Sequence, residues 1–226
     1  MDVNAFTQLL LACVVFLATH FVPSTPLRAV LVKALGQWGY TAVYSALAFF
    51  MIGWMGWAYG KAPVEPLWQG LRWLPALATP LSFILLACGL FASNPTIVGM
   101  YRQLKNEDPA RGMIRVTRHP VMWAFLIWAV AHVLARGDLK SLVFFGTFAL
   151  LAGAGTLLID ARKAKTLGDN WARFAAVTSN LPFAAILQGR NRLDAKEIGW
   201  RNPAIGLALY AAFFWLHPML FGARPW

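Results

Sequence analysis

Six long stretches of the chain contain no Lys, Arg, Asp or Glu, and this feature restricts the possible folds more than any other. They are residues 3–21, 34–60, 73–100, 119–135, 141–159 and 202–223. A helix that crosses a bilayer needs about 20 mostly apolar residues. The stretches are continuous rather than alternating, which argues against membrane-spanning strands. The sequence therefore predicts an all-α, polytopic transmembrane helical bundle of about six spans, forming a single domain over residues 1–226.

The distribution of basic residues predicts how the bundle is oriented. The net charge is +11, yet only 13% of the residues are charged. If the N-terminus lies outside, the inward loops 22–36, 93–119 and 160–202 hold 15 Lys and Arg, and the outward side holds 5. This bias follows the positive-inside rule. We therefore expect both termini outside the cytoplasm, and membrane lipid rather than nucleic acid as the partner of the excess charge.

The apolar segment at residues 3–21 lacks the basic start of a signal peptide and is predicted to be a retained helix. The inward segment 160–202 is too long for a simple connection. Its first part, residues 161–177, is basic and amphipathic, with Leu167, Trp171 and Phe174 on one face. This pattern is typical of a helix that lies on the inner membrane surface. A polar residue followed by proline predicts helix starts at Thr25, Asn94, Asn202 and His119.

Four histidines are the candidate functional residues, and all lie within or at the ends of the apolar stretches. They are His20, His119, His132 and His217. An ionisable group at membrane depth is unfavourable and therefore indicates function, although a histidine can also simply donate to a neighbouring helix carbonyl. No H-x-x-x-H, H-E-x-x-H or E-x-x-H pair occurs, and the apolar stretches hold no carboxylate. Zinc and di-iron sites are therefore not expected.

A neutral imidazole in an apolar cavity with arginines at its mouth is suited to heme b. Arg115 and Arg118 precede His119 at the predicted inner interface. Imidazole can ligate the iron, and guanidinium groups can bind the propionates. Arg118 is equally suited to a lipid phosphate. We predict Arg115, Arg118 and His119 as cofactor-binding residues, with the iron ligands drawn from His20, His132 and His217.

Several motifs together resemble the NnrU family. They are Met113–Pro120, Ile127–His132, Leu181–Ile186 and Gly189–Arg190. The resemblance extends to His20 near the start and His217 near the end, so it covers nearly the whole chain. The family includes bacterial membrane proteins linked to nitric oxide and nitrite metabolism, and the plant and cyanobacterial 15-cis-zeta-carotene isomerase. The resemblance implies a bacterial inner-membrane protein.

In the carotene isomerase the resemblance implies a heme b held by two histidines, which match His20 and His132 here. The isomerase also has a cysteine three residues before the second histidine, where this chain has Ala129. That difference bears on a redox-linked exchange of ligands and leaves heme binding itself intact. Depth along the predicted spans favours other pairs, His132 with His217 or His20 with His119. The ligand pair is therefore left open by the sequence.

A second resemblance is to membrane methyltransferases of the isoprenylcysteine carboxyl type. It rests on Arg118-His119-Pro120 followed by Asp160 and Gly168, although Trp171 and Phe174 replace two tyrosines of that family. The resemblance implies shared ancestry, with S-adenosylmethionine-dependent methyl transfer as the alternative function. The leading hypothesis is a heme-b-binding membrane protein. It acts either as a redox-dependent cis-trans isomerase of a lipophilic polyene or as an accessory factor of denitrification that partners a nitric oxide reductase.

Overall fold

The computed structural model describes residues 3–97 and 99–225, and every regular element within them is a helix. Six helices are long: α1 (Val3–Phe21), α2 (Leu27–Lys61), α3 (Leu74–Phe91), α5 (Pro120–Arg136), α6 (Leu139–Leu167) and α10 (Arg201–Phe221). Five are long and apolar enough to cross a membrane, and α5, with 17 residues, is the shortest of the six. The predicted all-α bundle is confirmed, and the protein is a multi-pass membrane protein.

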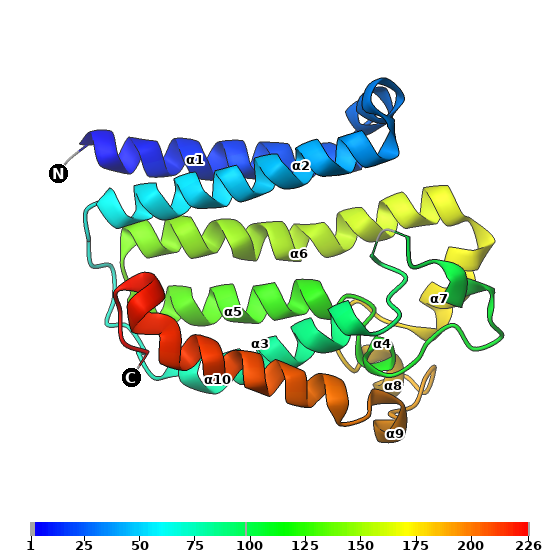
Figure 1. The fold of residues 1–226 in the computed structure, drawn as a ribbon. Coiled ribbons are helices and arrows are strands. Elements are labelled where there is room, and N and C mark those ends of the chain that lie inside the picture. The colour runs from blue at the N-terminus through cyan, green and yellow to red at the C-terminus, as the bar shows by residue number, and fades with distance from the viewer. Residues whose placement is uncertain (1–2, 98, 226) are drawn as a thin grey trace.

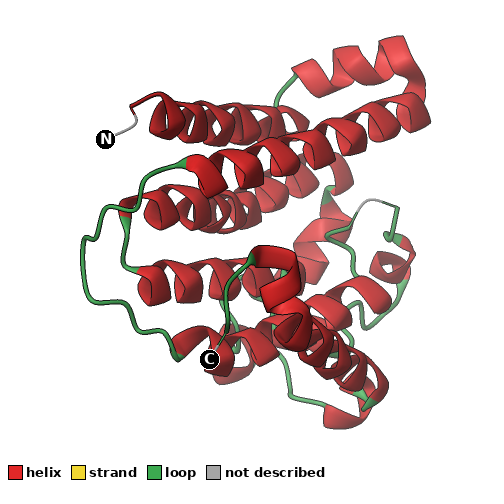
Figure 2. Cartoon of the chain, turned by 60° about the vertical axis from the view of Figure 1, so that its left-hand side comes forward, coloured by secondary structure: helices red, strands yellow, loops and turns green. Residues whose placement is uncertain are grey.

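The long helices lie side by side with alternating direction (Figure 1). Helix α6 packs against both α1 and α5, α2 packs against α1, and α3 packs between α5 and α10. Figure 2 shows the same order from a turned view, with loops joining the helix ends. Helix α1 begins and α10 ends at one end of the bundle, which we call the terminal end. The opposite, distal end carries nearly all of the short helices.

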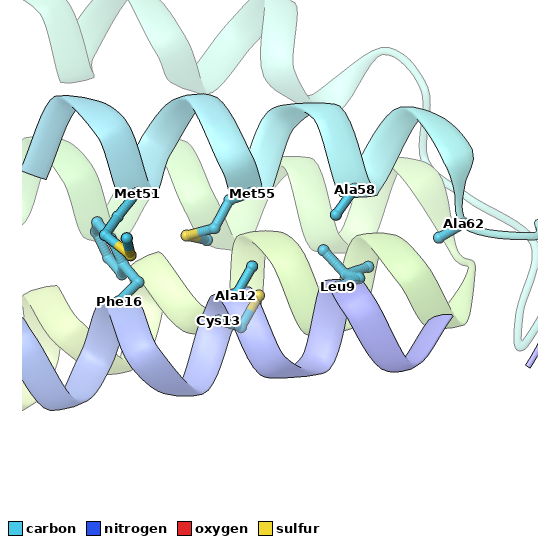
Figure 3. Packing of buried hydrophobic residues seen from close by; sticks show 8 residues of the cluster. All are labelled: Leu9, Ala12, Cys13, Phe16, Met51, Met55, Ala58 and Ala62. Atoms are coloured by element: carbon cyan, nitrogen blue, oxygen red, sulfur yellow. The ribbon is translucent and has the colours of Figure 1, made fainter. Parts of the chain in front are cut away.

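The first core cluster joins α1 to α2, largely through small and sulfur-containing side chains (Figure 3), and packs against larger side chains of α6 such as Phe144 and Phe148. Its buried members are Leu9, Ala12, Cys13, Phe16, Met51, Met55, Ala58 and Ala62. Lipid provides little hydrophobic drive for helix association, so small residues stabilise such a contact by permitting close packing. The outer surface instead carries large exposed apolar side chains such as Trp38, Phe49 and Trp215, as expected for contact with lipid.

The contact between α3 and α10 depends on a glycine. A Cβ at Gly206 would lie 2.6 Å from the carbonyl oxygen of Phe83 and 2.8 Å from Cα of Ile84. Real Cβ atoms do not approach backbone so closely, so α10 reaches α3 only because residue 206 lacks a side chain.

The distal end is built from short helices and loops. They are η1 (Val22–Ser24), η2 (Arg102–Lys105), α4 (Met113–Val116), α7 (Asp169–Val177), α8 (Ala184–Leu187) and α9 (Ala195–Ile198). A second apolar cluster lies here, formed by Leu104, Ala110, Ile114, Trp171 and Phe174. The distal end is therefore a packed unit with its own core.

The prediction for residues 161–177 was wrong. Helix α6 continues to Leu167, and the chain turns at Gly168 (φ 50°, ψ −128°) before α7 begins. Trp171 and Phe174 are 3% and 0% exposed and pack in the second core cluster. The apolar face that resembled a membrane-surface helix is covered by the protein's own chain.

The polar-proline rule identified one helix start correctly. His119 is the N-cap residue of α5, with Pro120 in the first turn. No helix follows Asn94; its Oδ1 instead accepts a hydrogen bond from the backbone N of Thr96 at 3.0 Å, which closes a turn. Helices α2 and α10 begin near the predicted positions, but neither has a side-chain cap.

Candidate functional site

The predicted site residues fall into two groups: three histidines on the long helices, and polar residues at the distal end. His132 lies in the last part of α5, towards the terminal end. Its Nδ1 donates to the carbonyl oxygen of Trp128 at 2.7 Å. The ring lies 5.1 Å from Trp128 and 4.9 Å from Phe145. His132 is also close enough to His217 to interact with it electrostatically. The structure therefore brings His132 and His217 into one region.

His20 lies in the last turn of α1, towards the distal end. Its ring is 3.9 Å from that of Phe16, and further ring contacts lead from Phe16 to Phe148 (5.3 Å) and from Phe148 to Trp128 (5.5 Å). A chain of ring contacts from α1, α6 and α5 thus connects His20 to Trp128 and, through it, to His132. The ligand pair implied by the family resemblance stays a prediction.

The three histidines share one hydrogen-bond arrangement. In His20, His132 and His217 the Nδ1 atom contacts a backbone carbonyl oxygen at 2.7–2.8 Å. A carbonyl only accepts, so each Nδ1 carries a proton, and in the neutral form of such a ring the lone pair is at Nε2. Metal-ligating histidines have this arrangement, since the second nitrogen donates to a carbonyl or carboxylate. No group of three or more His, Cys, Asp or Glu side chains in residues 3–97 and 99–225 is arranged to hold a metal ion.

His119 has different surroundings, at the distal end of α5. Its Nε2 lies 2.7 Å from Oδ1 of Asp160 on α6. Arg118 binds the same carboxylate with Nε at 2.9 Å and Nη2 at 2.6 Å. His119 is 1% exposed, and its Nδ1 is buried with no hydrogen-bond partner within the described part of the chain. Residues 42 positions apart thus form an Arg–Asp–His cluster in which the histidine is buried and the other two side chains are partly buried.

This cluster contains the residues on which the methyltransferase resemblance rests. Arg118, His119 and Asp160 do come together, as the motif implies. Trp171 and Phe174, however, belong to the second apolar core and carry no hydroxyl there. The two positions that are tyrosines in that family therefore have a packing role in this chain.

Arg115 is 4% exposed and is enclosed by acceptors. It donates to both carboxylate oxygens of Glu197 (2.7 and 2.8 Å), to Asp108 (2.6 Å) and to the Asn191 side chain (2.8 Å). Hydrogen bonding to Arg115 lowers the pKa of Glu197 from 4.5 to about 2. The same carboxylates raise the pKa of Arg115. Arg115 therefore connects α4 to α9.

The predicted propionate-binding role of Arg115 and Arg118 stays a prediction. In this structure both guanidinium groups are bound by carboxylates. The sequence contains one signal for these pairings: Asp108, Asp160 and Glu197 are among only nine acidic residues, and these three lie in or beside the inward segments. Carboxylates that are few among many cations are expected to form ion pairs with some of them.

The described residues include a shallow, open hollow on the face of α2, lined by Phe50, Gly53, Trp54 and Trp57. None of the predicted site residues lines it. Its wall is apolar and suited to contact with lipid or a lipophilic molecule.

A helical bundle with lipid-facing apolar sides and a packed distal end defines a class of multi-pass membrane protein. Within that class, residues 8–225 match the family described as NnrU protein, so the chain belongs to the NnrU family. This confirms the family predicted from the sequence motifs.

Two curated proteins are similar to this chain. The 15-cis-zeta-carotene isomerase of Arabidopsis thaliana chloroplasts is 33% identical over 117 residues, which are 50% of this chain and 31% of the relative. The corresponding protein of Zea mays is 32% identical over 124 residues, 51% of this chain and 33% of the relative. The chain therefore matches about a third of each relative's length. No solved structure matches the chain significantly.

Proposed function

We propose that this protein is a heme-b-dependent cis-trans isomerase of a carotenoid-like polyene in the membrane. The observation that carries the proposal is the similarity to two proteins named 15-cis-zeta-carotene isomerase, within a family match that covers nearly the whole chain. A polyene is a long apolar molecule, and it reaches a bundle of this kind through the bilayer. The apolar outer surface of α2, with Trp54 and Trp57 in its hollow, suits such a molecule.

The donor set of the structure fits heme b. His132 is the residue best suited to ligate the iron, because its Nδ1 is held by Trp128 and its Nε2 lone pair is left for a metal. His217 has the same arrangement through the carbonyl oxygen of Ala223 at 2.7 Å and lies within electrostatic range of His132. These observations favour His132 with His217 as the ligand pair over His132 with His20.

Heme would supply an iron centre whose oxidation state and protein ligands govern its reactivity towards a double bond. The residues of this chain would bind and orient the polyene and exclude water from the site. Trp128 and Phe145 cover the His132 ring with apolar surface, which keeps water from it. Ala129 is fully buried one turn before His132 and has no side-chain atom that could replace a histidine ligand. Ligand exchange through a cysteine at this position is therefore not part of the proposed chemistry.

The test begins with the protein purified in mild detergent from heme-supplemented cells. We expect a Soret band and a pyridine hemochrome of b type. His132→Ala should change the oxidised and reduced spectra, because the iron loses a ligand. His217→Ala should do the same, and His20→Ala serves as the matched histidine control with an expected wild-type spectrum. A colourless protein that takes up no heme on titration would overturn the cofactor proposal.

Turnover is tested separately, by incubating the heme-loaded protein with a cis polyene under reducing and oxidising conditions and separating the geometric isomers. We expect conversion to the trans isomer by wild type and little by His132→Ala. Heme binding without any isomerisation would contradict the enzyme proposal and favour an accessory role in nitric oxide respiration.

A further inference from the structure

Three basic side chains meet at the distal end, where α1, α2 and α6 come together. Arg28 lies in the first turn of α2, and Arg162 and Lys163 lie near the end of α6. Each is within electrostatic range of the other two. The Nη1 atom of Arg162 donates to the carbonyl oxygen of Pro23 at 3.0 Å. Backbone contacts therefore hold like charges in one place, although they repel each other.

No ion pair joins any of these three cations to a carboxylate in residues 3–97 and 99–225. Two other cations at the same end of the molecule, the buried Arg115 and the partly buried Arg118, have different partners. Arg115 and Arg118 each have a carboxylate oxygen at 2.6 Å. A charge removed from water needs a compensating partner. The contrast indicates that the three cations are compensated by a group that is not part of the chain.

Burial makes this lack of a partner significant for Lys163. Lys163 is 2% exposed, and its Nζ donates to the carbonyl oxygen of Pro95 at 3.1 Å and lies 3.9 Å from the ring centroid of Tyr101. A carbonyl dipole and an aromatic face attract a cation but do not neutralise it. Lys163 also shares a hydrogen bond with the Tyr101 side chain, so its described acceptors are a carbonyl and a phenol oxygen, and neither is a carboxylate.

Tyr40 provides an independent observation. It is 7% exposed, and its hydroxyl is buried with no hydrogen-bond partner among the described residues. Arg28 lies over its ring at 5.6 Å from the centroid, and Arg162 interacts with it electrostatically. A buried hydroxyl without a partner is unfavourable. An acceptor placed between the cations would satisfy Tyr40 at the same time.

We infer that Arg28, Arg162, Lys163 and Tyr40 bind an oxyanion, a phosphate or carboxylate group, carried by an amphipathic molecule of the membrane. Guanidinium groups match the oxygens of both anions, and an ammonium group is a common phosphate binder. The surrounding surface explains why the carrier is amphipathic. Trp38 and Val43 on α2 are 86% and 56% exposed, so an apolar chain can lie beside a headgroup bound here.

Two carriers share this chemistry: an anionic phospholipid and the propionates of heme. The inference does not rest on the proposed isomerase activity or on heme. It predicts that the site binds phosphatidylglycerol in protein that contains no heme, so failure of the cofactor proposal leaves this test intact.

The experiment measures binding by native mass spectrometry of the full chain in a neutral maltoside detergent. Phosphatidylglycerol, diacylglycerol with the same chains, inorganic phosphate and heme b are titrated in separate arms. The variants are Arg162→Gln, Lys163→Gln and Tyr40→Phe. Lys165→Gln is the matched control, since Lys165 is an exposed cation on the same helix. Thermal unfolding of each unliganded variant shows that it is folded.

We expect one phosphatidylglycerol to bind wild type and Lys165→Gln equally, and diacylglycerol not to bind specifically. Arg162→Gln and Lys163→Gln should each weaken phosphatidylglycerol binding about tenfold, and Tyr40→Phe by a smaller factor without loss of unliganded stability. Saturation by heme with the same dependence on Arg162 and Lys163 identifies the propionates as the oxyanion, and saturation by inorganic phosphate alone identifies a free anion. If no arm binds, or if binding is unchanged in all three variants, the site does not exist.

Discussion

Individual charged residues at the distal end fall into two groups. Arg115 and Arg118 are paired with carboxylates, whereas Arg28, Arg162 and Lys163 have none within the described chain. The first group connects segments far apart in sequence, since Glu197 lies 82 residues from Arg115. Pairs of this kind stabilise one arrangement of the loops. The pH dependence of stability should therefore report on the Arg115–Glu197 pair.

Replacing Glu197 with Gln tests that pair. The hydrogen bonds from Arg115 hold the pKa of Glu197 at about 2 in the folded protein, against 4.5 ordinarily. A lowered folded-state pKa gives stability that is complete above 4.5 and is lost as the pH falls towards 2. At pH 7 we expect Glu197→Gln to lose roughly 1 kcal/mol, because the carboxylate is partly exposed, and roughly 3 °C in Tm.

The measurement is thermal unfolding in detergent between pH 7 and pH 3. The difference between wild type and Glu197→Gln should shrink as the pH falls below about 4.5. Glu107→Gln is the control, because Glu107 is exposed and forms no ion pair within the described residues. A difference in Tm that is constant across this range would exclude the proposed linkage.

At the scale of elements, the sequence predicted the long helices well and the distal end poorly. Uncharged stretches define spans directly, because a bilayer imposes length and apolarity on each segment separately. The distal loops follow no such local rule. Trp171 and Phe174 matched the periodicity of a membrane-surface helix, but whether that face meets lipid or Leu104 and Ile114 depends on contacts made across many residues.

In the candidate site, too, local sequence predicted some features, and others depended on contacts between distant segments. Apolar context alone identified the histidines, and the motif at Arg118–Pro120 identified the polar cluster. The backbone partners of His132 and His217 and their mutual proximity required the packing of separate helices. The unpaired cations were not identified, because a positive inward loop is expected whether or not its charges are buried.

The packing of α3 against α10 gives a prediction at this scale. Gly206→Ala places a Cβ against the backbone of Phe83 and Ile84, so α10 must move away from α3. We expect a loss of roughly 1–3 kcal/mol from overpacking, which lowers Tm by roughly 2 to 10 °C. Gly146→Ala on α6 is the control: a Cβ there meets nothing within 4 Å, and alanine favours the helix. Equal effects of the two variants on thermal unfolding would contradict the close contact.

The whole molecule consists of two sets of helices joined through α6. Helices α1 and α2 lie on one side of it, and α5, α3 and α10 lie on the other (Figure 1). His20 belongs to the first set, and His132 and His217 belong to the second. The proposed oxyanion site lies between α2 of the first set and the end of α6, at the distal end, and the proposed iron ligands lie in the second set, towards the terminal end. Phosphatidylglycerol binding and heme ligation are therefore separable by mutation.

The orientation of this molecule in the membrane remains a prediction, and single cysteines test it. The native Cys13 and Cys88 are each 3% exposed and should not react with a membrane-impermeant maleimide. Lys61, at the terminal end, and Lys105, at the distal end, are both exposed. Because basic residues concentrate at the distal end, the positive-inside rule places that end in the cytoplasm. In intact cells we expect Lys61→Cys to be labelled at once, and Lys105→Cys only after the membrane is permeabilised. The reverse pattern would invert the orientation, and labelling of both positions in intact cells would contradict their location at opposite ends of a membrane-spanning bundle.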